Sequence, residues 1–211
     1  MESIASYERH LTEDLRRLST LVQAAVLEAG WHPPGTGRIR ILNLACGACD
    51  EATTLVTLAE AQGGIINKTN EVTLTGLDVR LREIGLAKER HKGKRFEFLV
   101  ADVSQRHLLP NLGRDFDWVF LRHQNYWHGR KIWQAIFDNG LELLAPDGLM
   151  MITSYFDREH LLAMEAIKAL GGELVCSRVN PLSRPMVTPG KSVDRHIAVF
   201  RKTNNRSISI Q

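Results

Sequence analysis

Apolar and polar positions follow two different periods along this chain. Residues 4–29 carry apolar side chains at every third or fourth position, which predicts a helical segment that ends at Gly30, with Thr12 as the cap of a second helix. From residue 38 onward, short runs rich in Leu, Ile and Val alternate with segments of helical spacing. The strand-type runs are 38–45, 71–79, 95–103, 115–123 and 149–156, and the helical segments are 50–62, 80–91, 131–145 and 158–172.

This alternation predicts βαβ units, and therefore a parallel sheet covered by helices on both faces. The end of the chain differs, because the strand-type runs 173–180 and 195–202 are joined by a proline-rich loop without a helix. We therefore expect an α/β fold, a three-layer sandwich around a seven-stranded, mostly parallel sheet with an antiparallel last strand. The expected organisation is an N-terminal helical segment (1–37), a core domain (38–202) and a frayed tail (203–211).

The composition narrows the class of protein. The chain is 44% hydrophobic and 24% charged, which is typical of globular proteins, and its formal charge of +3 does not require a nucleic-acid partner. No apolar run approaches the roughly 20 residues of a membrane span, and the polar N-terminus does not resemble a signal peptide. Cys46, Cys49 and Cys176 are too few for a disulfide scaffold and favour a reduced, cytoplasmic location.

Residues that follow the strands form the candidate site, since ligands of open parallel sheets bind at the carboxyl ends of the strands. Asp78 and Asp102 follow the second and third strands, and an acid after the second strand can bind the hydroxyl groups of a ribose. A single Asp in such a place more often caps the next turn. The pair, together with a glycine turn after the first strand, favours a nucleoside site.

The turn after the first strand, LNLACGACDEA at 42–52, admits three interpretations. Cys46 and Cys49 form a C-x-x-C before a helix, which is the setting of a thioredoxin-like redox site. A dinucleotide-binding turn would need G-x-G-x-x-G, of which only Gly47 is present. Neither of these interpretations explains Asp78, Asp102 and the later strands together.

The third interpretation rests on five motifs in order: ILNLACGACDEAT, LTGLDVR, FLVADVSQ, DFDWVFLRH and LLAPDGLMMITSY. Together they resemble the class I S-adenosylmethionine-dependent methyltransferases over roughly residues 38–202. The resemblance implies S-adenosyl-L-methionine as the cofactor, Asp78 as the ribose-binding acid and Asp102 as the adenine-binding acid. With the residues that follow the strands, the predicted cofactor-binding residues are Asn43, Ala45, Cys46, Gly47, Asp78, Val79, Asp102, Val103 and Arg122, and no metal site is predicted.

The first motif departs from the family pattern, which has an acid followed by alternating glycines. Asn43 stands in place of the acid, and Ala45 and Cys49 stand in place of two glycines. A non-glycine residue in the left-handed region costs about 1–2 kcal/mol. We therefore expect this turn to use other backbone angles.

The stretch LRHQNYWHG after the fourth strand gathers polar and aromatic side chains, and we expect it to line the acceptor site. His123 and Tyr126 are the predicted catalytic residues, and His123 comes first because an unperturbed imidazole accepts a proton near neutral pH. The alternative role for His123 is a hydrogen bond to neighbouring backbone. Tyr155 and Asp157 are also expected to face the acceptor, as is the proline-rich loop 181–194 with Arg184 and Lys191.

The acceptor is expected to be a small molecule, because the chain carries no recognisable RNA-binding appendage and no large inserted substrate domain. The basic run 80–95 lacks interleaved aromatic residues and contains Glu83 and Glu89, which indicates a solvated helix face rather than a nucleic-acid contact. An RNA or protein methyltransferase and a non-catalytic S-adenosylmethionine-binding domain stay open as alternatives. No association with a membrane is expected.

Overall fold

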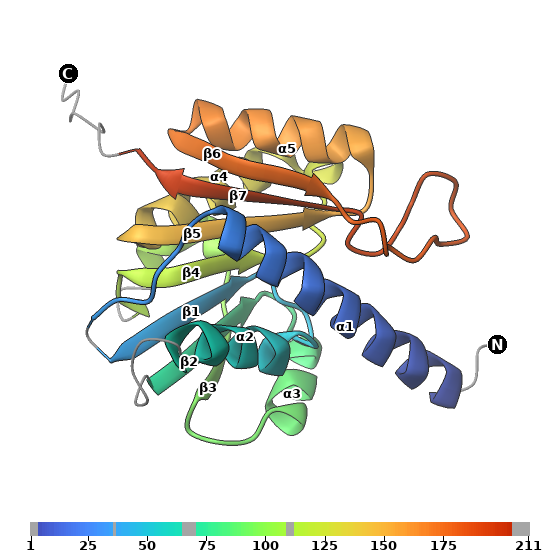
Figure 1. Ribbon diagram of the computed structural model, residues 1–211, viewed down its shortest axis with the longest axis horizontal. Coiled ribbons are helices and arrows are strands. Elements are labelled where there is room, and N and C mark those ends of the chain that lie inside the picture. The colour runs from blue at the N-terminus through green and yellow to red at the C-terminus, as the bar shows by residue number, and fades with distance from the viewer. Residues whose placement is uncertain (1–3, 36, 65–70, 109–111, 204–211) are drawn as a thin grey trace.

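The computed structural model describes residues 4–35, 37–64, 71–108 and 112–203 and shows one sheet between layers of helices (Figure 1). The strands are β1 (Arg38–Leu44), β2 (Glu71–Asp78), β3 (Phe96–Val100), β4 (Phe116–Leu121), β5 (Leu144–Ser154), β6 (Gly172–Val179) and β7 (His196–Lys202). The helices are α1 (Ile4–Glu28), α2 (Ala52–Gly64), α3 (Leu81–Arg90), α4 (Arg130–Leu143) and α5 (Asp157–Ala169), with short 3₁₀ segments η1 (Val103–Leu108) and η3 (Tyr126–His128).

The seven strands lie in the order β3-β2-β1-β4-β5-β7-β6. β1 pairs in parallel with both β2 and β4, so the strand order reverses at β1 and its carboxyl end borders the crevice where such sheets bind ligands. β7 lies between β5 and β6 and is antiparallel to both, which confirms the predicted antiparallel last strand. The amino end of β7 therefore shares an edge with the carboxyl ends of the other strands.

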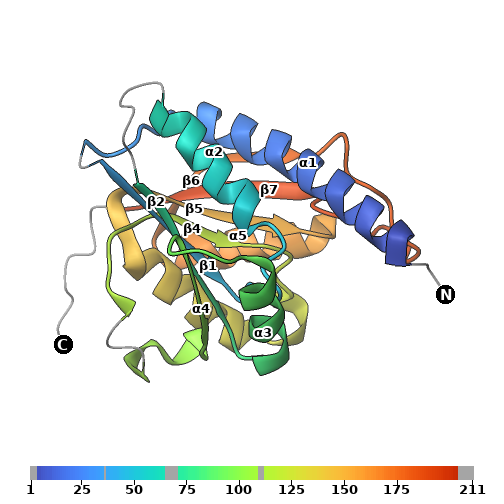
Figure 2. The ribbon, with the colours of Figure 1, turned by 90° about the horizontal axis from the view of Figure 1, so that it is seen from below.

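Helices cover both faces of the sheet, with α1 and α2 on one side and α4 and α5 on the other (Figure 2). The apolar stripe of α1 explains its position, because Leu18, Val22 and Ala25 are fully buried against β-strand side chains such as Ile39 and Val199. The second core, around Phe137, fills the opposite face. Among the described residues, no helix combines the length and the apolar composition that a membrane span requires.

Two predicted boundaries are wrong. The first helix runs unbroken through Thr12, because the apolar stripe continues across that position. The interval between the predicted helix 131–145 and the predicted strand 149–156 lies inside β5, which begins at Leu144 and pairs with Phe116 before a register shift. Gly148 permits this course, since a Cβ atom there would lie 2.7 Å from the carbonyl oxygen of Phe116. The predicted tail, apart from residue 203, lies outside the described residues.

Candidate active site

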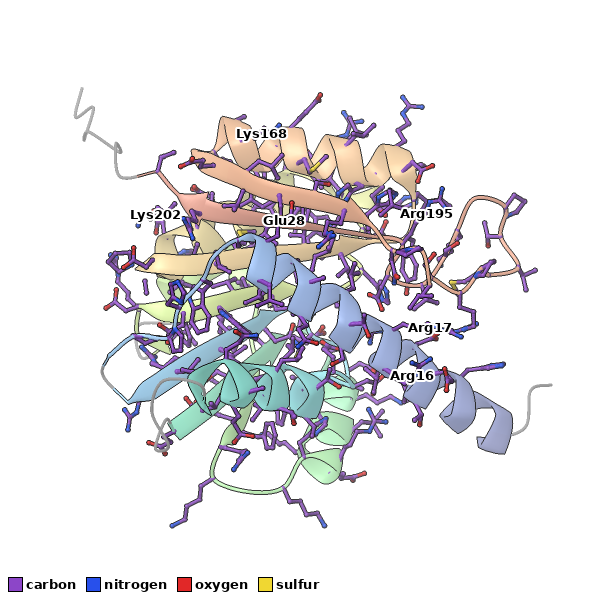
Figure 3. The ribbon with its side chains drawn as sticks, viewed as in Figure 1. Arg16, Arg17, Glu28, Lys168, Arg195 and Lys202 are labelled. Atoms are coloured by element: carbon purple, nitrogen blue, oxygen red, sulfur yellow. The ribbon has the colours of Figure 1, made fainter. Side chains whose placement is uncertain are left out.

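A cavity of about 950 Å³ opens at the edge of the sheet formed by the carboxyl ends of β1 to β5. Its wall combines the turn after β1, the ends of β2 and β3, the segment after β4 and the first turn of α5. The loop between β6 and β7 projects from this same edge beside the N-terminal half of α1, and Arg195 marks the point where that loop enters β7 (Figures 1 and 3). The volume is at the upper end of the roughly 300–1,000 Å³ that small-molecule sites occupy.

The first turn keeps three left-handed residues, although only one of them is glycine. Ala45 has a φ of 51°, Gly47 of 58° and Cys49 of 50°, so the expectation that this turn uses other backbone angles is wrong. Buried contacts hold the strained Cys49: its thiol accepts a hydrogen bond from the Asn43 amide at 3.2 Å, and its carbonyl oxygen lies 2.9 Å from His91 Nε2. The turn therefore has the backbone course of a glycine-rich loop without its glycines.

Asp78 ends β2 and is tied directly to this turn. Its carboxylate accepts the Gly47 N–H at 2.8 Å, the Arg80 N–H and Nε at 2.9 Å each, and Arg80 Nη2 at 3.1 Å. Burial raises the pKa of Asp78, but the hydrogen bonds from Arg80 and Gly47 outweigh it and hold the pKa below its usual value. Four donors match the roughly four lone-pair positions of a carboxylate, so a ligand that binds Asp78 must displace the Arg80 side chain.

Asp102, after β3, also bonds locally. It accepts hydrogen bonds from the Ser104 N–H at 3.0 Å, the Ser104 hydroxyl at 2.6 Å and Gln105 Nε2 at 2.8 Å. These bonds, led by that of the Ser104 hydroxyl, lower its pKa. Asp102 therefore caps η1 while it borders the cavity, and one lone-pair position is left for a ligand.

A chain of alternating charges runs along the cavity wall, where Glu51 and Arg122 line the cavity. The Asn43 amide donates to Glu51 Oε1 at 2.5 Å, and Arg122 Nη1 donates to Glu51 Oε2 at 3.3 Å. Arg122 also binds Asp194 with two parallel hydrogen bonds, from Nε at 3.1 Å and Nη2 at 2.7 Å. All three charged side chains are at most 10% exposed. This network links the first turn to the segment after β4 and to the residue that precedes β7.

The far half of the cavity is lined by groups suited to a second molecule. The imidazole of His123 stacks on the ring of Tyr155 at 3.9 Å, and the Lys191 ammonium lies 4.2 Å from the centre of that ring. Glu159, on the first turn of α5, is 3% exposed and borders the same space. Burial raises the pKa of Glu159 to about 7 and that of Tyr155 to about 12, so Glu159 can exchange a proton at neutral pH and Tyr155 keeps its own.

The structure brings nine of the predicted site residues to this one cavity: Ala45, Cys46, Gly47, Asp78, Val79, Asp102, Val103, Arg122 and His123. The other two lie behind its wall. Asn43 is fully buried and contacts Glu51, while Tyr126 packs against Phe137 and accepts a hydrogen bond from Gln134 at 3.2 Å. Of the expected acceptor contacts, Tyr155 and Lys191 border the cavity. Asp157 pairs with Arg195 and His196 outside it, and Arg184 binds Asp14 on α1.

Sequence reasoning missed Glu51, Glu159 and Asp194. Glu51 and Glu159 look like ordinary acids in the first turns of helices, where they complement the helix dipole, and no pattern marks them as buried. Asp194 could have been predicted from the sequence, because an antiparallel last strand brings the residues that precede it to the edge of the sheet where ligands bind. No group of three His, Cys, Asp or Glu side chains suited to a metal ion occurs in the described parts of the chain.

The two cysteines of the first turn are buried thiols without a disulfide. The hydrogen bond with Cys46 and burial raise the pKa of Cys49 well above its usual value. Reactive redox cysteines have lowered pKa values and exposed sulfur atoms, so this environment does not favour the redox interpretation.

No protein-family model and no curated protein matches the chain in sequence. Its structure is similar to that of a TehB-like SAM-dependent methyltransferase from Corynebacterium glutamicum, with a TM-score of 0.57 and 20% identity over 92% of this chain and 99% of that one. It is similar to the N-methyltransferase NodS from Bradyrhizobium japonicum WM9, with a TM-score of 0.57 and 16% identity over 96% and 99%. The [4+2]-cyclase SpnF also matches, with a TM-score of 0.57 and 19% identity over 78% of this chain and 59% of that one.

These similarities agree with the strand order, the antiparallel β7 and the cavity at the carboxyl ends of the strands. A cyclase is among the similar structures, so the fold does not by itself determine the reaction. The chain has the fold of the class I S-adenosylmethionine-dependent methyltransferases.

Proposed function

We propose that this protein is an S-adenosyl-L-methionine-dependent methyltransferase that acts on a small molecule in the cytoplasm. The observation that carries the proposal is the bond between the Asp78 carboxylate and the Gly47 N–H, at 2.8 Å. It joins the end of β2 to the first turn at the edge of the cavity, and Asp102 borders the same cavity from the end of β3. Two carboxylates beside an open glycine turn suit a ligand that presents ribose and adenine groups.

The residues present fit the cofactor in their chemistry. Gly47 lines the cavity without a side chain, and a Cβ atom there would lie 3.1 Å from Arg80 Nη2. The turn lacks a phosphate-binding run of glycines, and S-adenosylmethionine has no phosphate to bind. When bound, the cofactor supplies a methyl group on a sulfonium ion. Asp78 would bind the ribose hydroxyls, Asp102 the adenine, and the first turn the methionine end.

The acceptor half supports a small-molecule substrate. About 950 Å³ is more than a nucleoside cofactor needs, and the aromatic and ionisable groups of the far half enclose the remaining space. This half of the cavity would position the acceptor molecule, exclude water and supply a proton acceptor beside it, through His123, Tyr155 and Glu159.

Transfer of a labelled methyl group tests this function. The protein is incubated with methyl-labelled S-adenosylmethionine and, in separate reactions, with small metabolites, total RNA or a protein extract. We expect label in a small molecule, and inhibition by S-adenosylhomocysteine. Label in RNA or protein would favour the alternative acceptors, and binding of S-adenosylhomocysteine without any transfer would favour a non-catalytic domain.

A further inference from the structure

His123 and Asp194 form a buried pair from two distant segments. His123 follows β4 and Asp194 precedes β7, and His123 Nε2 lies 2.8 Å from Asp194 Oδ1. The imidazole is 18% exposed and borders the cavity, whereas the carboxylate is 2% exposed and lies behind it. The ring is therefore the member of the pair that a bound molecule can touch.

The carboxylate of Asp194 cannot turn away from the ring. Two hydrogen bonds from Arg122 hold it, and the Thr153 hydroxyl donates to its Oδ1 at 3.0 Å. The same hydroxyl accepts the backbone N–H of His123 at 3.1 Å, so one side chain fixes both members of the pair. Burial raises the pKa of Asp194, but His123 and Arg122 outweigh it and keep this carboxyl group ionised.

The backbone supports the same conclusion. His123 has a φ of 57° and Asp194 of 48°, and each left-handed conformation costs a non-glycine residue about 1–2 kcal/mol. Two strained residues thus contact one another, and the Tyr155 ring covers the imidazole face. Strain that persists at a cavity wall is typical of a side chain whose position matters for function.

The position of the ring proton follows from two competing contacts at Nε2. A proton on Nε2 is donated to the carboxylate at 2.8 Å, whereas a bare Nε2 accepts the backbone N–H of Asp194 at 3.2 Å. The contact with the charged oxygen is shorter and stronger, so Nε2 carries the proton. Nδ1 then keeps its lone pair, and no described residue makes a hydrogen bond to it.

We propose that Asp194 is a positioning residue that holds His123 in the Nε2–H form, and that His123 Nδ1 accepts a proton from the methyl acceptor. The acceptor is then a molecule whose nucleophilic atom bears a proton, such as a phenol or another hydroxyl or N–H compound, rather than a thioether or a tertiary amine. The bond from that atom to hydrogen breaks, its electron pair stays on the atom, and the new N–H bond makes an imidazolium beside Asp194. The proton later passes to water.

The assignment of the acceptor class rests on the proposed function, but the geometry of the pair does not. Nitrogen-15 NMR of histidine-labelled protein without ligand reports which ring nitrogen of His123 is protonated. We expect protonated Nε2 and bare Nδ1 in the unchanged protein, and a populated Nδ1–H form in the Asp194→Asn variant. Asp157→Asn is the matched control, since Asp157 forms a separate His–Asp pair, with His196 at 2.6 Å, and should leave the His123 resonances unchanged.

An Nδ1–H form in the unchanged protein would overturn the proposal, even if Asp194→Asn failed to fold. Once labelled products are identified, each acceptor should carry a proton on the methylated atom, and a methylated thioether or tertiary amine would also contradict it. In the His123→Gly variant, where glycine suits the left-handed backbone, added imidazole should restore methyl transfer. Failure of S-adenosylhomocysteine to bind, with the Nε2–H form intact, would refute the proposed function and leave the pair as described.

Discussion

Glu159 offers a direct check of the electrostatics of the acceptor half. Its usual pKa of 4.5 is raised to about 7 by burial. The folded protein therefore keeps a proton between pH 4.5 and 7 that the unfolded chain has already released. Because the folded pKa is the higher one, stability falls as the pH rises through this window, and the full loss is present above pH 7.

The size of this loss follows from the same values. The difference between 4.5 and about 7 corresponds to roughly 3 kcal/mol, at about 1.4 kcal/mol per pH unit. Glu159→Gln removes the ionisable group and keeps the shape of the side chain. The variant should be roughly 3 kcal/mol more stable than the unchanged protein at pH 8.5 and equal to it near pH 4.5.

Urea denaturation at these two pH values measures the difference in the free energy of unfolding between the variant and the unchanged protein. The contributions of ionisable groups common to both proteins cancel in this difference. Glu165→Gln is the control, because Glu165 is an exposed acid of the same helix and should change stability by less than about 0.5 kcal/mol at either pH. A stability difference for Glu159→Gln that is independent of pH would refute this account of the acceptor half.

Three further predictions concern single positions. Arg80→Gln should tighten binding of S-adenosylhomocysteine up to about fivefold, because an ion pair whose guanidinium is 60% exposed, worth at most about 1 kcal/mol, no longer competes for the Asp78 carboxylate. The matched Arg82→Gln should have no effect, and weaker binding by the Arg80 variant would contradict this competition. Ala45→Gly should stabilise the fold by about 0.5–1 kcal/mol in thermal denaturation, since relief of left-handed strain exceeds the added entropy of the unfolded chain, and a lower Tm would show that the methyl group matters more. Burial lowers the pKa of His160 to about 3, so between pH 7 and pH 5 only the unfolded imidazole takes up a proton. In Glu159→Gln, where Glu159 no longer titrates in this range, the free energy of unfolding should therefore fall by about 2 kcal/mol from pH 7 to pH 5. A free energy of unfolding that is the same at both pH values would contradict the burial of His160.

The periodicity of the sequence predicted which segments along the chain form strands and that most of them are parallel. It did so because strands covered by helices on both faces are apolar throughout, whereas the helices between them are apolar on one side only. The antiparallel β7 was predictable for a similar reason, since no helix separates it from β6. Boundaries at the site were less predictable. The predicted strand 115–123 ends at Leu121, because His123 takes up a left-handed conformation that no local preference indicates.

The cofactor half of the site was more predictable than the acceptor half. Asp78 ends β2 and Asp102 lies just beyond the end of β3, so topology alone brings them to one edge. The acceptor half depends on buried charges whose partners are far apart in sequence, such as Arg122 with Asp194 and Glu51. No local sequence pattern indicates such ion pairs, because each charged residue taken alone is of a type that usually lies on the solvated surface. The left-handed Cys49 shows the same limit, since contacts from Asn43 and His91 offset its strain.

We propose that the cavity binds S-adenosylmethionine through the Asp78 carboxylate at the end of β2. Calorimetric titration of S-adenosylhomocysteine into the unchanged protein and into Asp78→Asn tests this proposal. Asparagine can still accept the Gly47 N–H, so the first turn should persist, while the charged acceptor for the ribose hydroxyls is lost. We predict saturable binding at one site, weakened by about tenfold or more in the variant, as expected for a hydrogen bond to a charged group. Absence of saturable binding to the unchanged protein, or equal affinity in the variant, would contradict the account.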